Sequence, residues 1–146
     1  MKKRLLIVLF LTQLLFTACA TTITKDLRLE GEDLPEAVAR YWTYRVNNDL
    51  GMAYYYEHVS YTKMATRDFY MSRFVKNVRV DSFEILDIGK ESGSEGYVPV
   101  KLRIKTSVIK GLPFPVPPQM ENEITDLWVK KEGRWYRMNQ TMTGLY

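Results

Sequence analysis

Two side chains in this sequence have the chemistry for proton transfer. His58 is the only histidine, and an imidazole is the group whose charge changes most readily near neutral pH. It lies at the expected end of a short helix, where a histidine commonly interacts with the helix dipole or with solvent. Asp49 lies directly before that helix, where a carboxylate usually caps free backbone amides. For each residue we therefore favour the structural interpretation over the catalytic one.

Tyrosines form the second group of candidates, because the chain contains ten of them. Packing in a core, with each hydroxyl bonded to a polar partner, is the simpler interpretation. The functional interpretation is a pocket for a small apolar or aromatic molecule that the hydroxyls orient. Five tyrosines are expected near the inner face of a sheet or at the mouth of such a pocket: Tyr41, Tyr44, Tyr55, Tyr56 and Tyr70.

Motifs for other chemistry are missing from the sequence. It contains no HExxH, no G-x-S-x-G and no phosphate-binding loop. Asp81, Glu84 and Asp87 are expected on one strand, where a spacing of three does not place all of them on the same face. The sequence therefore predicts no metal site and no cofactor, and it favours binding over catalysis.

The N-terminus predicts export from the cytoplasm. Three basic residues at positions 2–4 precede an almost unbroken apolar run over residues 5–16, and small residues follow. This is the layout of a secretory signal peptide. The apolar run is shorter than the roughly 20 residues that a membrane-spanning helix needs. We therefore expect residues 1–18 to be a cleaved signal peptide.

The only cysteine, Cys19, follows this segment, and Ala18-Cys19 resembles the end of the lipobox of bacterial lipoproteins. The resemblance implies a diacylglyceryl anchor on Cys19, so that the lipid bilayer is a partner. Phe16 departs from the lipobox preference for leucine, and a plain signal peptide is the alternative. Ala20 is not aspartate, which by the same resemblance favours the outer membrane, facing the periplasm, in a Gram-negative envelope. Residues 19–32 are then the lipidated cysteine and a flexible polar tether.

Charge argues against nucleic acid as a partner. The chain has 21 basic and 17 acidic residues, and loss of Lys2, Lys3 and Arg4 with the signal peptide leaves 18 against 17, a net charge of +1. A nucleic-acid surface needs a clear basic surplus. With Cys19 lipidated, no thiol remains for a disulfide or a thiolate metal site.

Helices are expected first along the mature chain. Asp33, Pro35 and Glu36 have the order of a capping box with proline in the first turn, so a helix should begin there. Residues 50–58 indicate a second, short helix. A third is expected after Thr66, where apolar residues recur at spacings of three and four.

Strands follow the helices. Alternation of apolar and polar residues predicts strands over residues 78–88, 97–109, 121–130 and 134–143, the first of them bulged near residues 82–83. Gly133 is suited to the hairpin turn between the last two. We therefore expect one α+β domain over residues 33–146, with N-terminal helices packed on a curved antiparallel sheet.

Three segments resemble the nuclear transport factor 2-like superfamily, which includes ketosteroid isomerase. They are the run over residues 41–49, the following "A-Y-x-Y" helix over residues 52–56, and the closing Trp…Gly…Trp-Tyr hairpin over residues 128–136. The resemblance implies a cone or cystatin-like roll that encloses a pocket. Some members are enzymes, others only bind, and many pair through the open sheet face, which makes a homodimer plausible.

The proline-rich segment over residues 112–118 is the remaining candidate. Prolines stiffen an extended loop and reduce the entropy lost on binding. The segment is expected either to fold over the mouth of the pocket or to contact a partner through Phe114 and Val116. We thus expect a membrane-anchored envelope lipoprotein, non-catalytic, that binds a small apolar ligand or an envelope protein. The alternative is an isomerase or dehydratase with His58 or Asp49 as its base.

Overall fold

The computed structural model describes residues 31–74, 78–109 and 117–138. The predicted signal peptide, Cys19, Phe114 and Val116 lie outside these residues. Within the described ranges the element order is helices first and strands second, as the sequence predicts. The chain is therefore an α+β protein with a few helices and an open, four-stranded antiparallel sheet.

The longest of the described helices, α2 (Leu34–Val46), begins as the sequence predicts. The Asp33 carboxylate accepts a hydrogen bond from the backbone N–H of Glu36 at 2.9 Å, and the Glu36 carboxylate accepts one from the backbone N–H of Asp33 at 3.4 Å. This reciprocal pair satisfies two N–H groups that have no partner inside the helix. The helix ends at Val46 with Asn47 as its C-cap, and Asn48 takes the left-handed conformation at φ 57° that redirects the chain.

Four short helical segments follow in place of the two that the sequence predicts. They are α3 (Leu50–Ala53), the 3-10 turn η1 (Tyr54–Tyr56), α4 (Val59–Thr62) and α5 (Arg67–Ser72). The prediction of one helix over residues 50–58 was wrong because Glu57 is extended, at φ −71° and ψ 141°. There the backbone N–H of His58 donates to the carbonyl of Arg137 at 3.0 Å, so a tertiary contact replaces the helical bond.

The sheet is a meander of β1 (Val78–Ile88), β2 (Val98–Val108), β3 (Gln119–Lys131) and β4 (Arg134–Met138), in that spatial order. The predicted bulge in β1 is confirmed by a register shift between Val80 and Ser82, and a second shift lies between Ile85 and Asp87. Both residues of the β3–β4 turn have positive φ, 52° at Glu132 and 80° at Gly133, which suits the twist of a two-residue hairpin.

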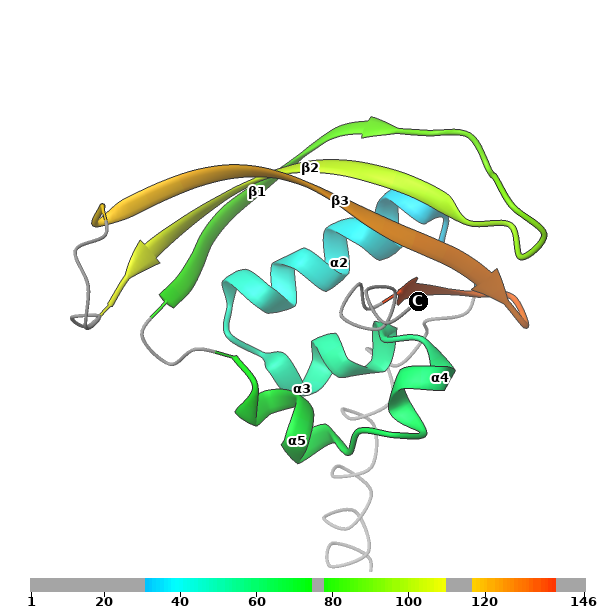
Figure 1. Cartoon of the computed structure of the whole chain (residues 1–146), viewed down its shortest axis with the longest axis horizontal. Coiled ribbons are helices and arrows are strands. Elements are labelled where there is room, and N and C mark those ends of the chain that lie inside the picture. The colour runs from blue at the N-terminus through cyan, green and yellow to red at the C-terminus, as the bar shows by residue number, and fades with distance from the viewer. Residues whose placement is uncertain (1–30, 75–77, 110–116, 139–146) are drawn as a thin grey trace, which may run out of the picture.

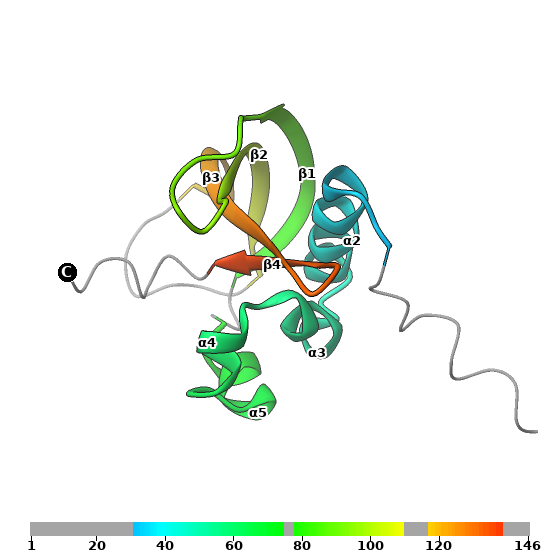
Figure 2. The ribbon, with the colours of Figure 1, turned by 90° about the vertical axis from the view of Figure 1, so that its right-hand side faces the viewer.

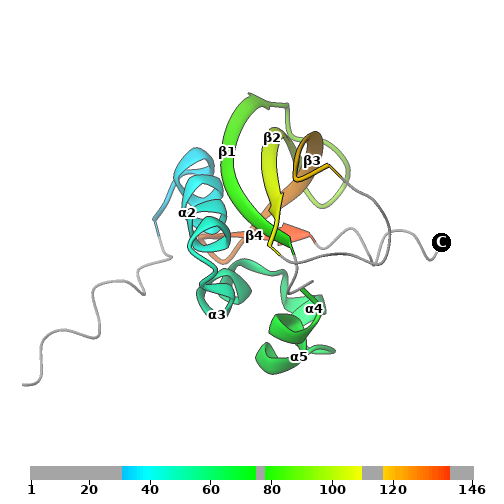
Figure 3. The same cartoon turned by 90° about the vertical axis from the view of Figure 1, so that its left-hand side faces the viewer.

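The three long strands bend over α2, and the short helices lie on the side of α2 away from them (Figure 1). Views from the two sides show β1, β2 and β3 as one curved layer, with β4 running back toward the short helices (Figures 2 and 3). The core lies between α2 and this layer and includes the inward-facing side chains of β2: Val98, Val100, Leu102 and Ile104.

The N-terminal boundary of this packing includes a buried carboxylate. Glu32 is 7% exposed, accepts a hydrogen bond from the Tyr56 hydroxyl at 3.0 Å, and forms an ion pair with Arg40 at 2.9 Å. The packed structure therefore includes Glu32, the last residue of the predicted tether. Of the helices in the described part of the chain, none has the length and apolar character needed to cross a membrane.

Candidate functional site

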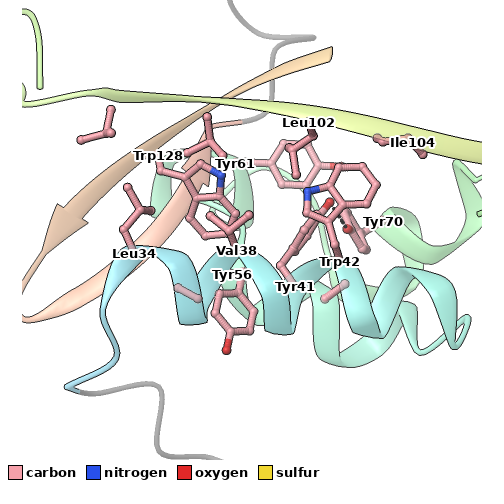
Figure 4. Packing of buried hydrophobic residues seen from close by; sticks show 14 of the residues in the cluster. Leu34, Val38, Tyr41, Trp42, Tyr56, Tyr61, Tyr70, Leu102, Ile104 and Trp128 are labelled. Carbon is pink, nitrogen blue, oxygen red and sulfur yellow. Dashed lines mark hydrogen bonds between the residues drawn. The ribbon is translucent and has the colours of Figure 1, made fainter. Parts of the chain in front are cut away.

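Aromatic side chains fill the space between α2 and the sheet (Figure 4). Tyr41 is at their centre, with its ring edge-on to Trp42 at 5.4 Å and to Trp128 at 5.8 Å between centroids. Such T-shaped pairs add to the free energy gained by burial. Tyr41 and Trp128 are both fully buried, so the polar groups attached to this cluster are also removed from water.

A buried carboxylate joins α2 to the end of the sheet. Asp126, 1% exposed, accepts a hydrogen bond from the indole N–H of Trp42 at 3.1 Å on one oxygen. Its other oxygen accepts one from the guanidinium of Arg137 at 2.8 Å. Buried ions of this kind are tolerated only when they are paired and hydrogen-bonded. Asp126 is paired in this way and has a structural role.

A second buried carboxylate, Glu57, is only partly satisfied. Its Oε1 accepts hydrogen bonds from the Tyr41 hydroxyl at 3.2 Å and from Arg137 at 3.4 Å, whereas its Oε2 is buried with no partner among the described residues. Burial raises the pKa of the Glu57 carboxyl, and the nearby Arg137 opposes that rise. The parallel bridge between Glu57 and Arg137 brings these side chains together.

Arg137 is the cation that both carboxylates share. Burial acts against its charge, but the carboxylate of Asp126, which accepts a hydrogen bond from Arg137, and the nearby Glu57 hold the pKa of the guanidinium above its usual range. Arg137 therefore stays positive while its charge is offset by Asp126 and Glu57 at hydrogen-bond distance.

Hydroxyl groups extend the network toward a pocket. The Tyr41 hydroxyl lies 3.3 Å from that of Tyr70, and Arg45 donates to Tyr41 at 3.2 Å. Burial raises the pKa of both phenols, so both remain protonated. Each hydroxyl can donate one hydrogen bond and accept others, which lets the network rearrange when a further polar group enters.

The pocket itself has a volume of about 210 Å³. It is lined by three guanidinium groups and one carboxylate, together with aromatic side chains: Arg45, Arg73, Arg137, Glu57, Tyr61, Tyr70 and Phe74. Among the described residues no carboxylate forms an ion pair with Arg45 or Arg73. The guanidinium of Arg45 lies 3.9 Å from the ring centroid of Phe74.

Unpartnered polar atoms in this wall are a sign of an incomplete site. The Nε of Arg45 and the hydroxyl of Tyr61 are both buried with no hydrogen-bond partner among the described residues. Tyr61 as a whole is only 4% exposed. Buried polar groups are normally satisfied, so a cluster of unsatisfied ones beside a pocket calls for a partner. Excess positive charge indicates that this partner is an anion.

A larger hollow adjoins the pocket. Its volume is about 610 Å³, and it shares Arg45 and Phe74 with the smaller pocket. Most of its other lining side chains are apolar, from α3, α5, β1 and the end of β2: Leu50, Met71, Val78, Val80 and Ile109. The stacked pair of Arg45 and Phe74 therefore lines both a charged pocket and a mainly apolar hollow, whose other polar lining residues are Asn48, Arg79 and Thr106.

The two predicted proton-transfer candidates cap helices. Asp49 accepts a hydrogen bond from the backbone N–H of Met52 at 3.2 Å, which confirms the capping interpretation. His58 begins α4, so its predicted place at a helix end was wrong; its Nδ1 accepts from the backbone N–H of Ser60 at 3.3 Å. Burial lowers the pKa of His58. Neither residue lines the pocket or the hollow.

The five predicted tyrosines occupy different environments. Tyr70 lines the pocket, and Tyr41 reaches it only through hydrogen bonds to its lining residues. Tyr56 is buried with its hydroxyl on Glu32, and Tyr44 packs against the core with its ring 6.3 Å from that of Tyr56. Tyr55 is 39% exposed.

Sequence reasoning missed the ionic residues of the site. Asp126 carried a usable signal, because it alternates with Ile124 and Trp128 and therefore shares their inward face. Glu57 and Arg137 carried no such signal, since they meet only through contact between a short helical segment and β4. Within the described residues no group of three or more His, Cys, Asp or Glu is arranged to hold a metal ion.

Fold and site together define an α+β protein with a buried ionic network beside a small, positively charged pocket. Comparison with models of protein families finds no match, and comparison with curated proteins finds none either.

Proposed function

We propose that this protein is a lipid-anchored envelope protein whose α+β domain binds a small molecule in the pocket between α5, β4 and α2. The observation that carries the proposal is the presence of two guanidinium groups, Arg45 and Arg73, that line the pocket without a carboxylate partner among the described residues. The Nε of Arg45 is also buried without a hydrogen-bond partner among the described residues, which costs stability unless a ligand accepts from it.

The cone-shaped roll of the nuclear transport factor 2-like superfamily is part of the same proposal. Long antiparallel strands that bend over α2 support it (Figure 1). A pocket lined by residues of the helices and of β4 supports it as well. In that arrangement Arg45 of α2 and Arg137 of β4 contribute to the pocket, and its other lining residues come from the segment over residues 57–74.

The anchor is proposed from the N-terminal sequence. Cys19→Ala should release the protein from membranes, because a diacylglyceryl cysteine contributes about 0.8 kcal/mol of binding per buried methylene. The measurement is the distribution of the full chain between the soluble and membrane fractions. Continued retention of the Cys19→Ala variant in membranes would refute lipid anchoring at this residue.

Binding in the pocket is tested by native mass spectrometry of the full chain purified from its own membranes. We expect a retained small molecule in the wild-type protein and its loss from the double variant Arg45→Gln/Arg73→Gln. Lys63→Gln is the matched control, since it removes an exposed positive charge that lines neither the pocket nor the hollow. Equal retention by all three proteins would contradict binding at this pocket.

Proton-transfer catalysis is the second candidate, and one observation favours it. Glu57 is a buried carboxyl whose pKa burial raises, and it lines the pocket together with Tyr70. Carboxyls in such surroundings act as general acids or bases in enzymes. His58 and Asp49 would then be spectators in an isomerase or dehydratase, and Glu57→Gln would abolish turnover without preventing ligand retention.

A further inference from the structure

We infer that the ligand is a single-chain amphipathic anion, with its acidic head group in the charged pocket and its apolar chain in the adjoining hollow. This inference rests on the proposed binding function and adds the chemical class of the ligand. It follows from three features of the described residues: the sizes of the two compartments, the charge of the inner one, and the side chains that line both.

Size requires both compartments. Small-molecule sites in proteins usually have volumes of roughly 300–1,000 Å³. The charged pocket, at about 210 Å³, is smaller than this range and holds no more than a head group. The adjoining hollow, at about 610 Å³, lies within the range and accommodates the body of a ligand.

Charge determines the head group. Arg137 is paired with Asp126 and Glu57, so the guanidinium groups left without a carboxylate are those of Arg45 and Arg73; three guanidinium groups against two carboxylates leave a net positive charge. A guanidinium presents two parallel N–H donors, whose spacing matches the two oxygens of a carboxylate or two oxygens of a phosphate. The unpartnered Tyr61 hydroxyl and Arg45 Nε would supply further donors to such a group.

Position connects the two compartments. Arg45 and Phe74 line both the pocket and the hollow. Their side chains stack, with the guanidinium carbon of Arg45 3.9 Å from the ring centroid of Phe74. A head group bound by the Arg45 guanidinium therefore has its attached chain directed past Phe74 to the apolar side. There Met71, Val80 and Ile109 offer surface whose burial stabilises an alkyl chain, by about 0.8 kcal/mol per methylene.

The test compares four probes that separate charge from chain. Decanoate has both the anionic head and the chain, decan-1-ol has the chain alone, acetate has the charge alone, and decyltrimethylammonium has the chain with the opposite charge. Binding of each labelled probe is measured by equilibrium dialysis against the full-length protein in phosphatidylcholine nanodiscs, with partition into empty nanodiscs subtracted. Decanoate is expected to bind at least about tenfold more tightly than any other probe.

Variants locate the bound probe. Arg73→Gln should weaken decanoate binding by about fivefold or more without affecting decan-1-ol, because Arg73 is exposed and its loss leaves the core unchanged. Ile109→Asp should also weaken decanoate, since Ile109 is 61% exposed in the hollow and the new carboxylate repels both head and chain. Lys63→Gln is the control for the loss of one positive charge and should leave decanoate binding unchanged.

Several outcomes would overturn the inference. Decan-1-ol or decyltrimethylammonium bound as tightly as decanoate would remove the role of the guanidinium groups, while leaving a binding pocket intact. Acetate bound as tightly as decanoate would remove the role of the hollow. If none of the four probes binds, or if decanoate binding is the same in Arg73→Gln, the ligand class is wrong. The proposed binding function is tested separately: it is supported if the purified protein retains a small molecule in the native mass spectrum and contradicted if it retains none.

Discussion

The two faces of the sheet use charge in opposite ways. On the outer face, Arg103 of β2 lies between acidic residues of both neighbouring strands, 2.9 Å from Glu84 and 3.1 Å from Glu123. Lys101 and Lys105 extend this ladder by pairing with carboxylates of β3. On the inner side, fewer charges lie close together: the carboxylates of Glu57 and Asp126 are buried, and the guanidinium groups around the pocket outnumber them.

The origin of each arrangement explains the difference. Outer charges pair because strand register sets Glu84, Arg103 and Glu123 side by side across three strands. Inner charges come from α2, α5, the segment at Glu57 and β4, which only the tertiary structure brings together. Exposed pairs contribute little to stability, whereas buried charges are costly unless they are fully paired. The buried carboxylates Glu57 and Asp126 are paired with Arg137, whereas Arg45 is half-buried and Arg73 exposed, and both line one pocket without a carboxylate partner among the described residues. Function explains the convergence of these two cations better than stability does.

The largest expected effect comes from removing the shared inner cation. Arg137→Met leaves Asp126 and Glu57 buried without a counter-ion, which typically destabilises a protein by about 3–5 kcal/mol. The measurement is the free energy of unfolding from urea titration. Arg103→Met is the matched change on the outer face. Equal losses of unfolding free energy in the two variants would contradict the claim that the inner and outer charges differ in their contribution to stability.

A smaller effect is expected from the hydrogen bond that α2 makes to the network. Trp42→Phe removes the indole N–H that Asp126 accepts, and an unmet buried acceptor costs about 1–3 kcal/mol. Trp128→Phe is the control, because it removes an equal volume from the same core but its indole N–H has no partner among the described residues. Trp42→Phe should therefore be the more destabilising change in urea titration, and the reverse order would contradict the role given to Asp126.

Glu57 links stability to pH. Its pKa is higher in the folded protein than in the unfolded chain, mainly through burial, so folding takes up a proton. That contribution is complete below the ordinary carboxyl pKa of about 4.5 and is lost as pH rises through the folded value. Glu57→Gln should therefore remove a decline in stability with rising pH above about 4.5.

The outer face again supplies the control for this measurement. Glu123→Gln is the same chemical change at an exposed carboxylate, whose pKa is lowered by hydrogen bonds from Lys101 and Arg103. A lowered carboxyl pKa makes stability depend on pH only below about 4.5, so this variant should keep the wild-type profile above that pH. Unfolding free energies at a series of pH values give both profiles. If the stability of the Glu57→Gln variant declines with rising pH as steeply as that of the wild-type protein, another group is responsible for the decline.

Local patterns in the sequence were sufficient for the outer face and most of the fold. Alternation along residues 98–105 predicts which side chains face the core, and the capping box predicts the start of α2. These features depend on neighbours a few residues away. The extended conformation of Glu57, by contrast, depends on its bridge to Arg137, eighty residues further along the chain, and periodicity cannot reveal such a contact.

The candidate site was predicted only in part for the same reason. Tyr70 was expected in the pocket and lines it, but the guanidinium groups that give the pocket its charge were not recognised. From sequence alone, an arginine is expected either to be exposed or to form an ion pair. Only the tertiary structure shows which arginines have no carboxylate partner. His58 attracted attention by residue type although its surroundings make it a helix cap.

The smallest expected effect is that of Arg103→Met on the outer face. All of its partners are at least 44% exposed in their side chains, so water and salt already screen the interactions that the substitution removes. The unfolding free energy should change little at low ionic strength, and the remaining difference from the wild-type protein should vanish in 1 M NaCl, where the Debye length is about 3 Å. The loss of unfolding free energy in Arg137→Met should be the same at this salt concentration as at low salt, because a buried ion pair is screened much less than an exposed one. A salt-independent loss in Arg103→Met would mean that the outer ladder is shielded from solvent, as it would be if that face were covered by a second copy of the chain.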